Sequence, residues 1–489
     1  MRIFERLQYL ASLSYLSIAC LNQGSNTLTG ALYLASICLT VASIMIEGVR
    51  MAQYPSLISL FILSPISFAF TGICCSMTSI QIALTLLSSS LLYIYGESDY
   101  SQYKFCGTYK VGYKTIRTDK YDNEIGVYYP IDTQKTVQKL TENQKAYLVD
   151  PKNVNHFVNG MNRAMTLGHP PKDGQKNGWF FKHLMSIVLD AVKGAQISKD
   201  FHDGAKPIVP IVLSHGLSGN YQFYHLMCAD YASNGFIVFA INHRDDTCTY
   251  TFSSDGKPQY FDSTIKLYDL EKRLAQLNIR AQEAIALIDE ICDSKKILNK
   301  LDFVNEKIKI DTNRIGIMGH SFGGATAIKA SQLDSRIKAT IAYDPWMYLL
   351  DKEVQAKQIK LNSNLISITA EGFHHFSKIN IDQWKDTQLL HEQATQKENN
   401  ENLFLKSCHH NDYCDLSVIW PFEIQLLVDK VYPPRRYAHK VYQMNIQLGM
   451  SFLGKIGFGD NYSHKEIVKE NQGLIKRFVT YDNVDQTKQ

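Results

Sequence analysis

Residues Gly319-His320-Ser321-Phe322-Gly323-Gly324 stand between a short apolar run, Arg314–Met318, and an alanine-rich stretch that begins at Ala325. The run predicts a buried β-strand, and the stretch after the motif predicts a helix. The glycines two positions before and after Ser321 fit the G-x-S-x-G pattern, in which a sharp strand-to-helix turn exposes a serine hydroxyl. The amino terminus of the helix stabilises negative charge that develops beside it. In this context the motif predicts a nucleophilic serine at Ser321.

Similar β-branched runs recur through the chain, and each ends in a polar turn. They cover residues 208–214, 235–242, 314–318, 337–343, 365–369 and 403–407. A long helix is predicted over residues 264–295, where leucine, isoleucine and alanine recur at helical spacing. Strands that alternate with helices predict a mostly parallel central sheet with helices on both faces. Ligands of such a sheet bind beyond the carboxyl ends of its strands.

Two further segments complete the body of the chain. Residues 109–113 and 124–130 have the pattern of antiparallel strands. Residues 131–206 are polar and irregular, apart from one amphipathic stretch near 181–192. We therefore expect residues 97–489 to form one α/β domain with a helical tail at its carboxyl end.

The first 96 residues have a different composition. Charged residues make up 20% of the whole chain, but only Glu47 and Arg50 are charged between residues 7 and 96. About twenty apolar residues are enough to cross a bilayer. Residues 1–96 are therefore predicted to be a membrane region with four transmembrane helices near 5–21, 28–46, 55–73 and 78–95.

The position of the positive charges predicts an orientation for these helices. Arg2 and Arg6 precede the first span, and Arg50 follows the second. Because cationic residues are retained on the cytoplasmic side, the body is expected on that side of the membrane. The first segment could alternatively be a cleaved signal peptide, which would place the body on the opposite side.

The composition excludes several classes of protein. A chain with 23 Phe and 28 Tyr is not disordered. A net charge of +4 over 489 residues gives no concentrated basic surface, so no nucleic-acid partner is expected. Ten cysteines are too few and too irregularly spaced for a disulfide scaffold.

A nucleophilic serine of this kind needs a histidine base, an acid that orients the base, and an oxyanion hole. On this architecture the chain order is serine, acid, histidine. Asp344 and Glu371 each end a predicted strand after Ser321, so either can be the acid. His409 and His410 follow the last predicted strand, so the base is one of these two.

The oxyanion hole is predicted to combine two loops. One donor is the backbone N–H of Phe322, and the other comes from the loop opened by Ser214-His215-Gly216-Leu217. Trp346 and Phe373 are further candidates for contact with substrate, because aromatic side chains at such a site can contact lipid, and each could equally be a core or rim residue.

Four motifs in the same order resemble the platelet-activating factor acetylhydrolase family, the plasma and intracellular type II group of lipases. They are Ser214–Leu217, Gly235–Asp245, Gly319–Thr326 and Asp344–Met347, and the similarity runs from about Tyr109 to about Phe452. The resemblance implies an α/β-hydrolase fold. It also implies calcium-independent hydrolysis, without a cofactor, of the sn-2 ester of phospholipids with short or oxidised acyl chains.

The resemblance also implies roles for particular residues. Ser321 corresponds to the nucleophile, Asp344 to the acid, and Leu217 and Phe322 to the oxyanion donors. The family's histidine is followed three residues later by an aromatic residue and five residues later by an aspartate. His410 meets both conditions, through Tyr413 and Asp415, and His409 meets neither.

Three alternatives stay open beside this hypothesis. Cys408, His409, His410 and Cys414 could form a metal cluster, although their spacing suits no common zinc site. The enzyme could act on another ester, such as a small soluble ester or a polyester. The fold could also serve a binding protein without activity. The apolar head favours a phospholipid substrate, because it would hold the site at the lipid surface.

Overall fold

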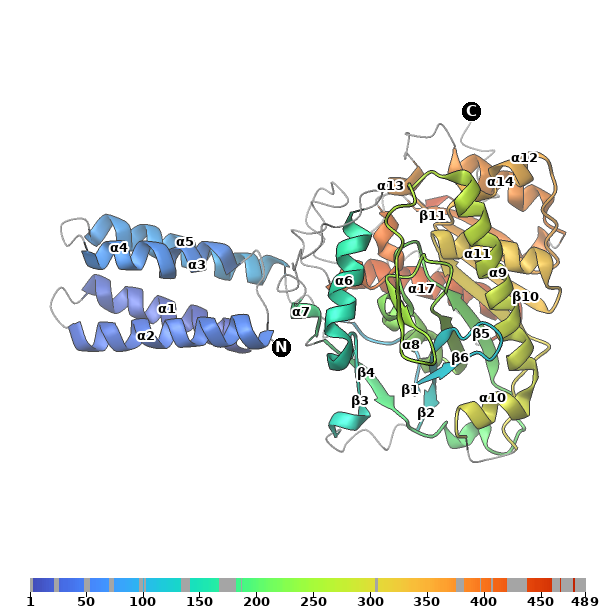
Figure 1. The fold of residues 1–489 in the computed structure, drawn as a ribbon, viewed down its shortest axis with the longest axis horizontal. Coiled ribbons are helices and arrows are strands. Elements are labelled where there is room, and N and C mark those ends of the chain that lie inside the picture. Colours follow the sequence, from blue (N-terminus) through green and yellow to red (C-terminus); the bar gives the residue numbers. More distant parts are fainter. Residues whose placement is uncertain are drawn as a thin grey trace. The chain divides into compact units, whose positions relative to one another are not determined.

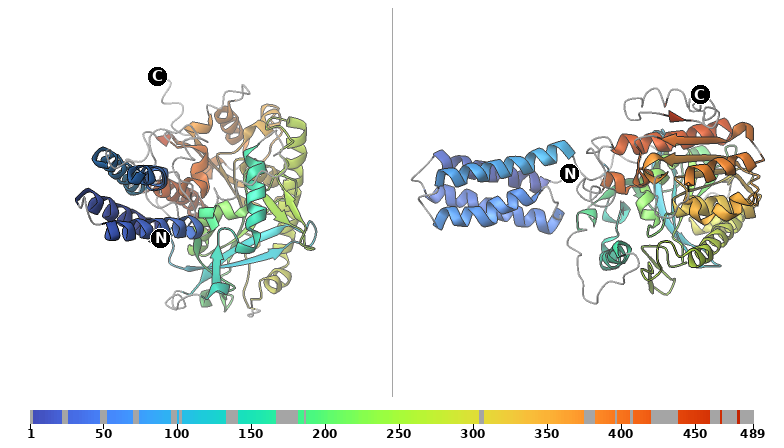
Figure 2. Two further views of the ribbon diagram at one scale, coloured as in Figure 1. Left: turned by 60° about the vertical axis from the view of Figure 1, so that its left-hand side comes forward. Right: turned by 90° about the horizontal axis from the view of Figure 1, so that it is seen from above.

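The computed structural model describes residues 3–21, 26–47, 53–69, 74–95, 100, 103–132, 141–166, 182–185, 187–303, 307–374, 382–395, 397–405, 408–419, 438–459, 467 and 478–479. The chain divides into two compact units (Figures 1 and 2). The helical unit contains residues 1–102 with the segments 176–187 and 418–436. The sheet unit contains residues 103–175, 188–417 and 437–489. Arg2 and Arg50, on which the predicted orientation depends, lie outside the described residues.

The helical unit is built from long helical segments at all four places where spans are predicted. They are α1 (Ile3–Leu21), α2 (Asn26–Ala42) with a π-helical turn (Ser43–Glu47), α3 (Tyr54–Ile58) with a second π-helical turn (Ser59–Leu63) and α4 (Ser64–Ala69), and α5 (Cys74–Tyr95). Among the described residues, one helix, Thr27–Glu47, is long and apolar enough to cross a membrane. The apolar helices Tyr54–Ile66 and Met77–Leu91 are shorter. Four spans therefore stay a prediction.

The sheet unit is organised around an eleven-stranded mixed sheet with the order β13-β12-β11-β10-β9-β5-β6-β2-β1-β4-β3. The strands are β1 (Lys110–Arg117), β2 (Glu124–Ile131), β3 (Lys145–Tyr147), β4 (Val188–Lys193), β5 (Val209–Ser214), β6 (Phe236–Ile241), β9 (Ile315–His320), β10 (Ile337–Tyr343), β11 (Asn364–Ala370), β12 (Glu401–Leu405) and β13 (Phe478–Val479). The six strands from β6 to β12 in this order are parallel to their neighbours. Both predicted antiparallel strands are present as β1 and β2. Residues 406–407 of the last predicted strand lie outside the described residues.

The register of the parallel strands aligns their carboxyl ends. Ser214 at the end of β5 pairs with Gly319 in β9, and His320 at the end of β9 pairs with Tyr343 at the end of β10. Because parallel strands end at the same edge, the residues that follow β5, β9 and β10 meet there. This edge holds the predicted site.

Helices cover both faces of this sheet. They are α8 (His225–Ser233), α9 (Leu270–Cys292), α10 (Ser294–Lys300), α11 (Phe322–Leu333), α12 (Asp351–Gln355), α13 (Glu371–His374), α14 (Gln383–Gln393), α15 (Leu416–Ile419) and α17 (Ala438–Lys455). α9 and α11 pack together on the face that buries Ile315 and Ile317. α8 and α17 meet on the other face, where Tyr231 and Tyr343 share a hydrogen bond of 2.8 Å. This mixed sheet between helical layers fits an α/β-hydrolase fold.

Two differences from the predictions have local causes. The helix predicted over residues 264–295 begins at Leu270, because the Asp269 carboxylate accepts the N–H of Lys272 and caps the first turn. The segment predicted to be irregular, 131–206, contains β3, β4, α6 (Val154–Met165) and α7 (Lys182–Met185). Its strands are short and partly exposed, so they lack the continuous apolar run that identifies the central strands.

Candidate active site

Ser321 occupies a tight turn between β9 and α11. Its φ is +59°, which an L-residue rarely adopts, and its N–H donates to the carbonyl of Tyr343 at 3.0 Å. A Cβ on Gly319 would lie 2.1 Å from the carbonyl oxygen of Gly323, and a Cβ on Gly323 would lie 1.9 Å from that of Ser214. Both flanking positions therefore require glycine, and the predicted elbow has a steric explanation.

Asp344 and His410 form a hydrogen-bonded pair. Asp344 directly follows β10 and is fully buried, and its Oδ1 accepts the N–H of Ala370 at 2.9 Å. Its Oδ2 lies 2.6 Å from Nδ1 of His410. Because an ionised carboxylate can only accept, Nδ1 carries the proton and Nε2 is free to act as a base. The ring of His410 lies 4.5 Å from that of His320, the residue before Ser321.

Tyr413 and Asp415, the two residues by which the family motif distinguishes His410 from His409, have a structural role. His410–Tyr413 form a 3₁₀ turn, which begins where the N–H of His409 donates to Oδ2 of Asp412 at 2.7 Å. Tyr413 is fully buried, with its ring 5.8 Å from that of His320. Asp415 accepts hydrogen bonds from the N–H of Leu226 on α8 and the hydroxyl of Tyr442 on α17. These two anchors fix the turn that presents His410.

Burial lowers the pKa of His410 from its usual value to about 3. A general base works only in its neutral form, which dominates above the pKa. We expect the acid limb of the kcat/KM profile to fall below pH 6.5, and esterase assays from pH 4 to 9 will measure it. An acid limb above pH 6.5 would mean that the Asp344 carboxylate raises the pKa of His410 by more than burial lowers it.

Phe373 is a neighbour of His410 that sequence patterns did not identify as such. Its ring stacks on the imidazole with a centroid distance of 3.8 Å and an interplanar angle of 13°. Phe373 belongs to the short helix α13, which begins at Glu371, the other candidate acid. The stacked ring fixes the plane of the imidazole, while Asp344 fixes its rotation.

The two predicted oxyanion loops lie against each other at the elbow. A Cβ on Gly216 would lie 3.3 Å from Cβ of Ser321. The N–H of Gly216 donates to the hydroxyl of Tyr224 at 2.9 Å, and that hydroxyl lies 2.9 Å from Nδ1 of His320. Tyr224, which no motif pointed to, therefore ties the loop before Leu217 to the strand end before Ser321. The N–H of Phe322 lies in the first turn of α11, where helix geometry leaves it without an intrahelical acceptor.

Trp346 packs beneath the site. Its backbone N–H donates to the carbonyl of Ser321 at 2.9 Å, and its ring lies edge-on to that of Phe322 at 5.5 Å. The side chain is 5% exposed. The structure thus gives Trp346 a packing role, and contact with substrate stays a prediction.

The cysteines and histidines near residue 410 do not form a shared cluster. Cys414 Sγ lies 3.5 Å from the carbonyl of Asn411, and His410 is bonded to Asp344. In the part of the chain that the structure describes, no three His, Cys, Asp or Glu side chains are grouped to hold a metal ion.

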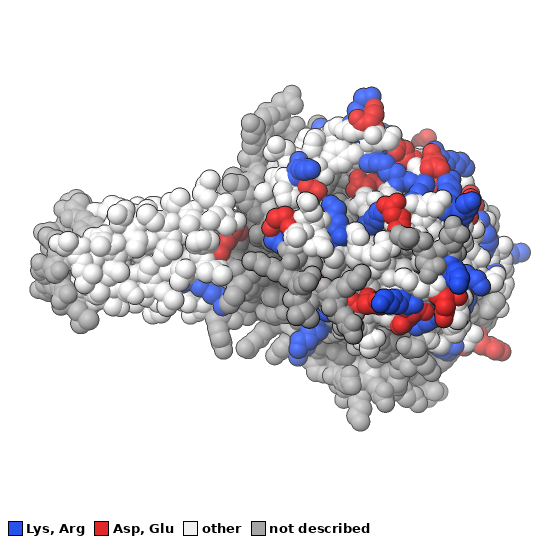
Figure 3. All heavy atoms as spheres, turned by 90° about the horizontal axis from the view of Figure 1, so that it is seen from below, with Lys and Arg blue, Asp and Glu red and all other residues white. Residues whose placement is uncertain are grey.

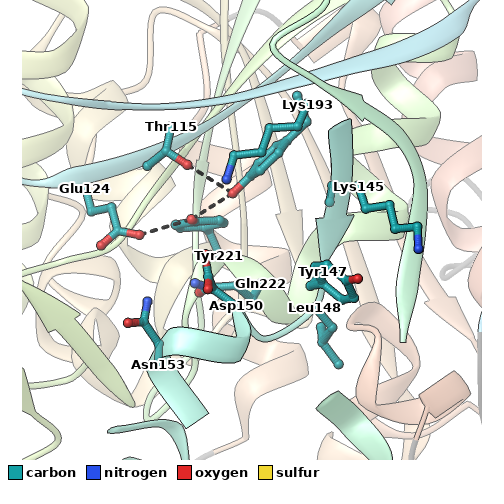
Figure 4. A pocket seen from close by; sticks show the side chains of 12 residues that line it. Thr115, Glu124, Lys145, Tyr147, Leu148, Asp150, Asn153, Lys193, Tyr221 and Gln222 are labelled. Carbon is teal, nitrogen blue, oxygen red and sulfur yellow. Dashed lines mark hydrogen bonds between the residues drawn. The ribbon is translucent and has the colours of Figure 1, made fainter. Parts of the chain in front are cut away.

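A polar cavity of about 220 Å³ lies elsewhere in the sheet unit, beside β1, β3 and β4 (Figure 4). The hydroxyl of Tyr221 donates to Glu124 at 3.1 Å and shares a hydrogen bond of 2.9 Å with the hydroxyl of Tyr113. Burial raises the pKa of Glu124. Neither Ser321 nor His410 lines this cavity, so it is separate from the predicted site.

The chain is similar to one protein family and to several known proteins. The chain matches the family described as platelet-activating factor acetylhydrolase, isoform II, over residues 95–473. The platelet-activating factor acetylhydrolase of Cavia porcellus is 28% identical over 254 residues, which cover 49% of this chain and 55% of the relative. That of Bos taurus is 37% identical over 186 residues, covering 35% and 41%. That of Canis lupus familiaris is 30% identical over 289 residues, covering 55% and 59%.

The chain spans about half the length of the curated relatives it matches. A solved structure, a ferulic acid esterase from Streptomyces cinnamoneus, is 17% identical with a TM-score of 0.49, and the alignment covers 74% of this chain and 96% of that one. The family match extends over most of the chain, from the end of α5 to beyond α17. The chain therefore belongs to the platelet-activating factor acetylhydrolase, isoform II, family.

Proposed function

We propose that this protein is a membrane-anchored serine esterase that hydrolyses the sn-2 ester of phospholipids with short or oxidised acyl chains, without calcium. The observation that carries the proposal is the bond of 2.6 Å between His410 and Asp344 at the strand edge that also presents Ser321. Membership of the family and the names of the relatives support the substrate class.

The proposed mechanism follows from these positions. Ser321 Oγ attacks the ester carbonyl while Nε2 of His410 takes its proton, and the N–H groups of Leu217 and Phe322 stabilise the oxyanion. Collapse of this intermediate breaks the ester C–O bond, and His410 returns the proton to the departing lysophospholipid alkoxide. Water then attacks the acyl-enzyme, again deprotonated by His410, and releases the fatty acid with Ser321 restored.

The helical unit has the polarity of a protein that sits in lipid. Large apolar side chains are exposed along it, for example Leu10 at 63% and Met45 at 64%. The face seen in Figure 3 is almost free of charge. An almost uncharged surface with many large apolar side chains exposed is unusual on a protein in water.

The interior of the same unit is polar. Gln8 on α1 donates to Ser56 on α3 at 3.1 Å, and the N–H of Ser56 donates to Ser88 on α5 at 2.9 Å. The Glu47 carboxylate, 7% exposed, accepts the backbone N–H groups of Phe4 and Glu5 on α1 at 2.9 and 3.0 Å. Helices in a bilayer require this arrangement, with apolar side chains on the outside and hydrogen-bonded polar groups on the inside. This arrangement is the reverse of that in a protein surrounded by water. It supports the proposed division into a membrane region, residues 1–96, and a hydrolase domain, residues 97–489.

Hydrolysis of a phospholipid series tests the proposal. Phosphatidylcholines with sn-2 chains from acetyl to oleoyl are compared with p-nitrophenyl acetate, using the wild type and Ser321→Ala. We expect rates that depend on Ser321, are unchanged by EGTA, and fall as the sn-2 chain lengthens. Activity on the soluble ester with none on any phospholipid would favour the alternative substrate class. Activity on neither would favour a binding protein.

The proposed orientation places the sheet unit on the cytoplasmic side. In sealed microsomes, protease added outside is expected to degrade residues 97–489 and leave residues 1–96, because the charges before α1 and after α2 stay cytoplasmic. Immunoblots of tags at the carboxyl end will measure this. Survival of the tag until detergent is added would place the body on the opposite side, as cleavage of a signal peptide would.

A further inference from the structure

Helix α9 carries a stripe of polar side chains that faces the interior of the sheet unit. Arg273, Gln276, Arg280 and Glu283 are each at most 5% exposed. They are three and four residues apart, so they share one face of the helix. Burying a guanidinium is unfavourable unless its donors are satisfied. The contacts of the stripe therefore show what it holds in place.

Arg280 holds the oxyanion loop through its backbone. Its Nη1 donates to the carbonyl of His215 at 2.6 Å. Its Nε lies 3.1 Å from Oδ2 of Asp245, whose carboxylate balances the charge. Its Nη2 donates to Oγ1 of Thr247 at 2.6 Å and lies 3.1 Å from Nδ1 of His215. Asp245 and Arg280 are both fully buried along their side chains.

The imidazole of His215 is contacted at both ring nitrogens. The backbone N–H of His243 can only donate, and it points at Nε2 of His215 at 3.2 Å. Burial and the charge of Arg280 lower the pKa of His215, so its ring is neutral. Nδ1 lies between Nη2 of Arg280 at 3.1 Å and the carbonyl oxygen of Gly216 at 2.7 Å, so the guanidinium and the loop carbonyl meet at this ring nitrogen.

The carbonyl of Gly216 belongs to the peptide that carries a predicted oxyanion donor, the N–H of Leu217. The carbonyl of Gly216 also accepts the N–H of Gly219 at 3.1 Å, so its orientation is fixed twice. In a trans peptide the carbonyl and the following N–H point in opposite directions. The N–H of Leu217 is therefore aimed by the contacts on the carbonyl of Gly216, one of which is with His215.

Arg280 also contacts the second half of the hole. Its guanidinium carbon lies 4.4 Å from the ring centroid of Phe322, in the geometry of a cation–π contact. Phe322 supplies the other predicted donor N–H. One buried side chain thus touches both residues that bracket the oxyanion site, His215 before Leu217 and Phe322 after Ser321.

We propose that Arg280 is a positioning residue that aligns the two oxyanion donors, acting through His215 and Phe322 rather than on the substrate. The proposal rests on the esterase function proposed above. Misaligned donors lose contact with the developing oxyanion while the ground-state ester still binds. The predicted effect is therefore on kcat and not on KM.

The test replaces Arg280 without leaving a buried charge behind. Arg280→Met is combined with Asp245→Asn, and the control is Arg273→Met. Arg273 is equally buried on the same helix, but it donates to the side chain of Gln276 and to the carbonyls of Ile265 and Lys266, none of which belongs to the oxyanion loop. Arg280→Lys is measured in parallel, because it keeps the charge beside Asp245 and loses the forked contacts. The single variant Asp245→Asn shows how much of the change in the double variant comes from the second substitution.

We expect kcat of the double variant on p-nitrophenyl acetate to fall about 100-fold with KM within about threefold. Its affinity for a trifluoromethyl ketone, whose adduct carries the same oxyanion, should fall in parallel. Arg273→Met should keep kcat within about threefold, whatever its loss of thermal stability. Arg280→Lys should fold and lose about 10-fold in kcat, so the test stands even if the double variant does not fold.

Equal losses of kcat in the Arg273 and Arg280 variants would overturn the proposal, as would unchanged ketone affinity beside a reduced kcat. Either result would assign Arg280 a structural role alone. Failure of the proposed function would give a different result. The wild type would be inactive, or Ser321→Ala would hydrolyse the ester as fast as the wild type.

Discussion

Replacing Ser321 with alanine is expected to lower kcat about a million-fold, the largest single effect in this protein. The substitution removes the attacking oxygen and leaves only the weak catalysis that binding and the oxyanion hole supply. Steady-state assays on p-nitrophenyl acetate measure the loss, with thermal unfolding to show that the fold is kept.

Ser331→Ala is the matched control for this variant. Ser331 is a buried serine on α11, the helix that follows Ser321, and its hydroxyl shares a hydrogen bond of 2.6 Å with that of Thr340. Its loss should lower the free energy of unfolding by about 1 kcal/mol and leave kcat unchanged. More than about 1% of wild-type turnover in Ser321→Ala would show that another group is the nucleophile.

Asp344→Asn is expected to lower kcat about 10,000-fold, because an amide nitrogen in place of Oδ2 would favour the wrong tautomer of His410. The structure favours this carboxylate through its hydrogen bond of 2.6 Å to Nδ1. Assays of purified variants at constant pH measure the effect.

Glu371→Gln is the control for the choice of acid, and it should retain kcat within about threefold. His409→Ala and His410→Ala provide the same comparison for the base, and only the second should abolish turnover. If the kcat of Glu371→Gln falls by several orders of magnitude while Asp344→Asn stays active, the acid is Glu371 and not Asp344.

The parts of the molecule that follow local rules are the parts that the sequence predicts well. β5, β6, β9 and β10 are buried on both faces, so each appears as a continuous apolar run. The elbow at Ser321 needs glycine at two nearby positions, and both lie within the same six-residue motif. Such features depend on neighbours in the chain, and a single sequence contains them in full.

The pairing of residues distant in the chain is harder to predict. Asp344 and His410 are 66 residues apart, and only the register of β10, β11 and β12 brings them together. Local patterns left Glu371 and His409 as equal alternatives. The contacts of Tyr224, Phe373 and Arg280 likewise depend on tertiary packing, and no spacing in the sequence distinguishes these residues from ordinary core positions.

The composition of residues 1–96 suggested a membrane region, but hydropathy does not reveal which side chains face inward. The structure adds that information through the buried bonds among Gln8, Ser56 and Ser88 and through the exposed leucines and isoleucines around them. Helix Thr27–Glu47 alone meets the length and hydropathy of a span among the described residues. The polarity of the whole unit is therefore the stronger argument for lipid contact.

The central claim is that Ser321 forms a covalent bond with the reacting group of the substrate. Mass spectrometry of the full-length protein, digested after treatment with a fluorophosphonate, tests it most directly. We predict one adduct on the peptide that contains Ser321, formed in step with the loss of esterase activity, and no adduct in Ser321→Ala. Complete inactivation with the adduct on another residue, or full activity with Ser321 labelled, would contradict the account.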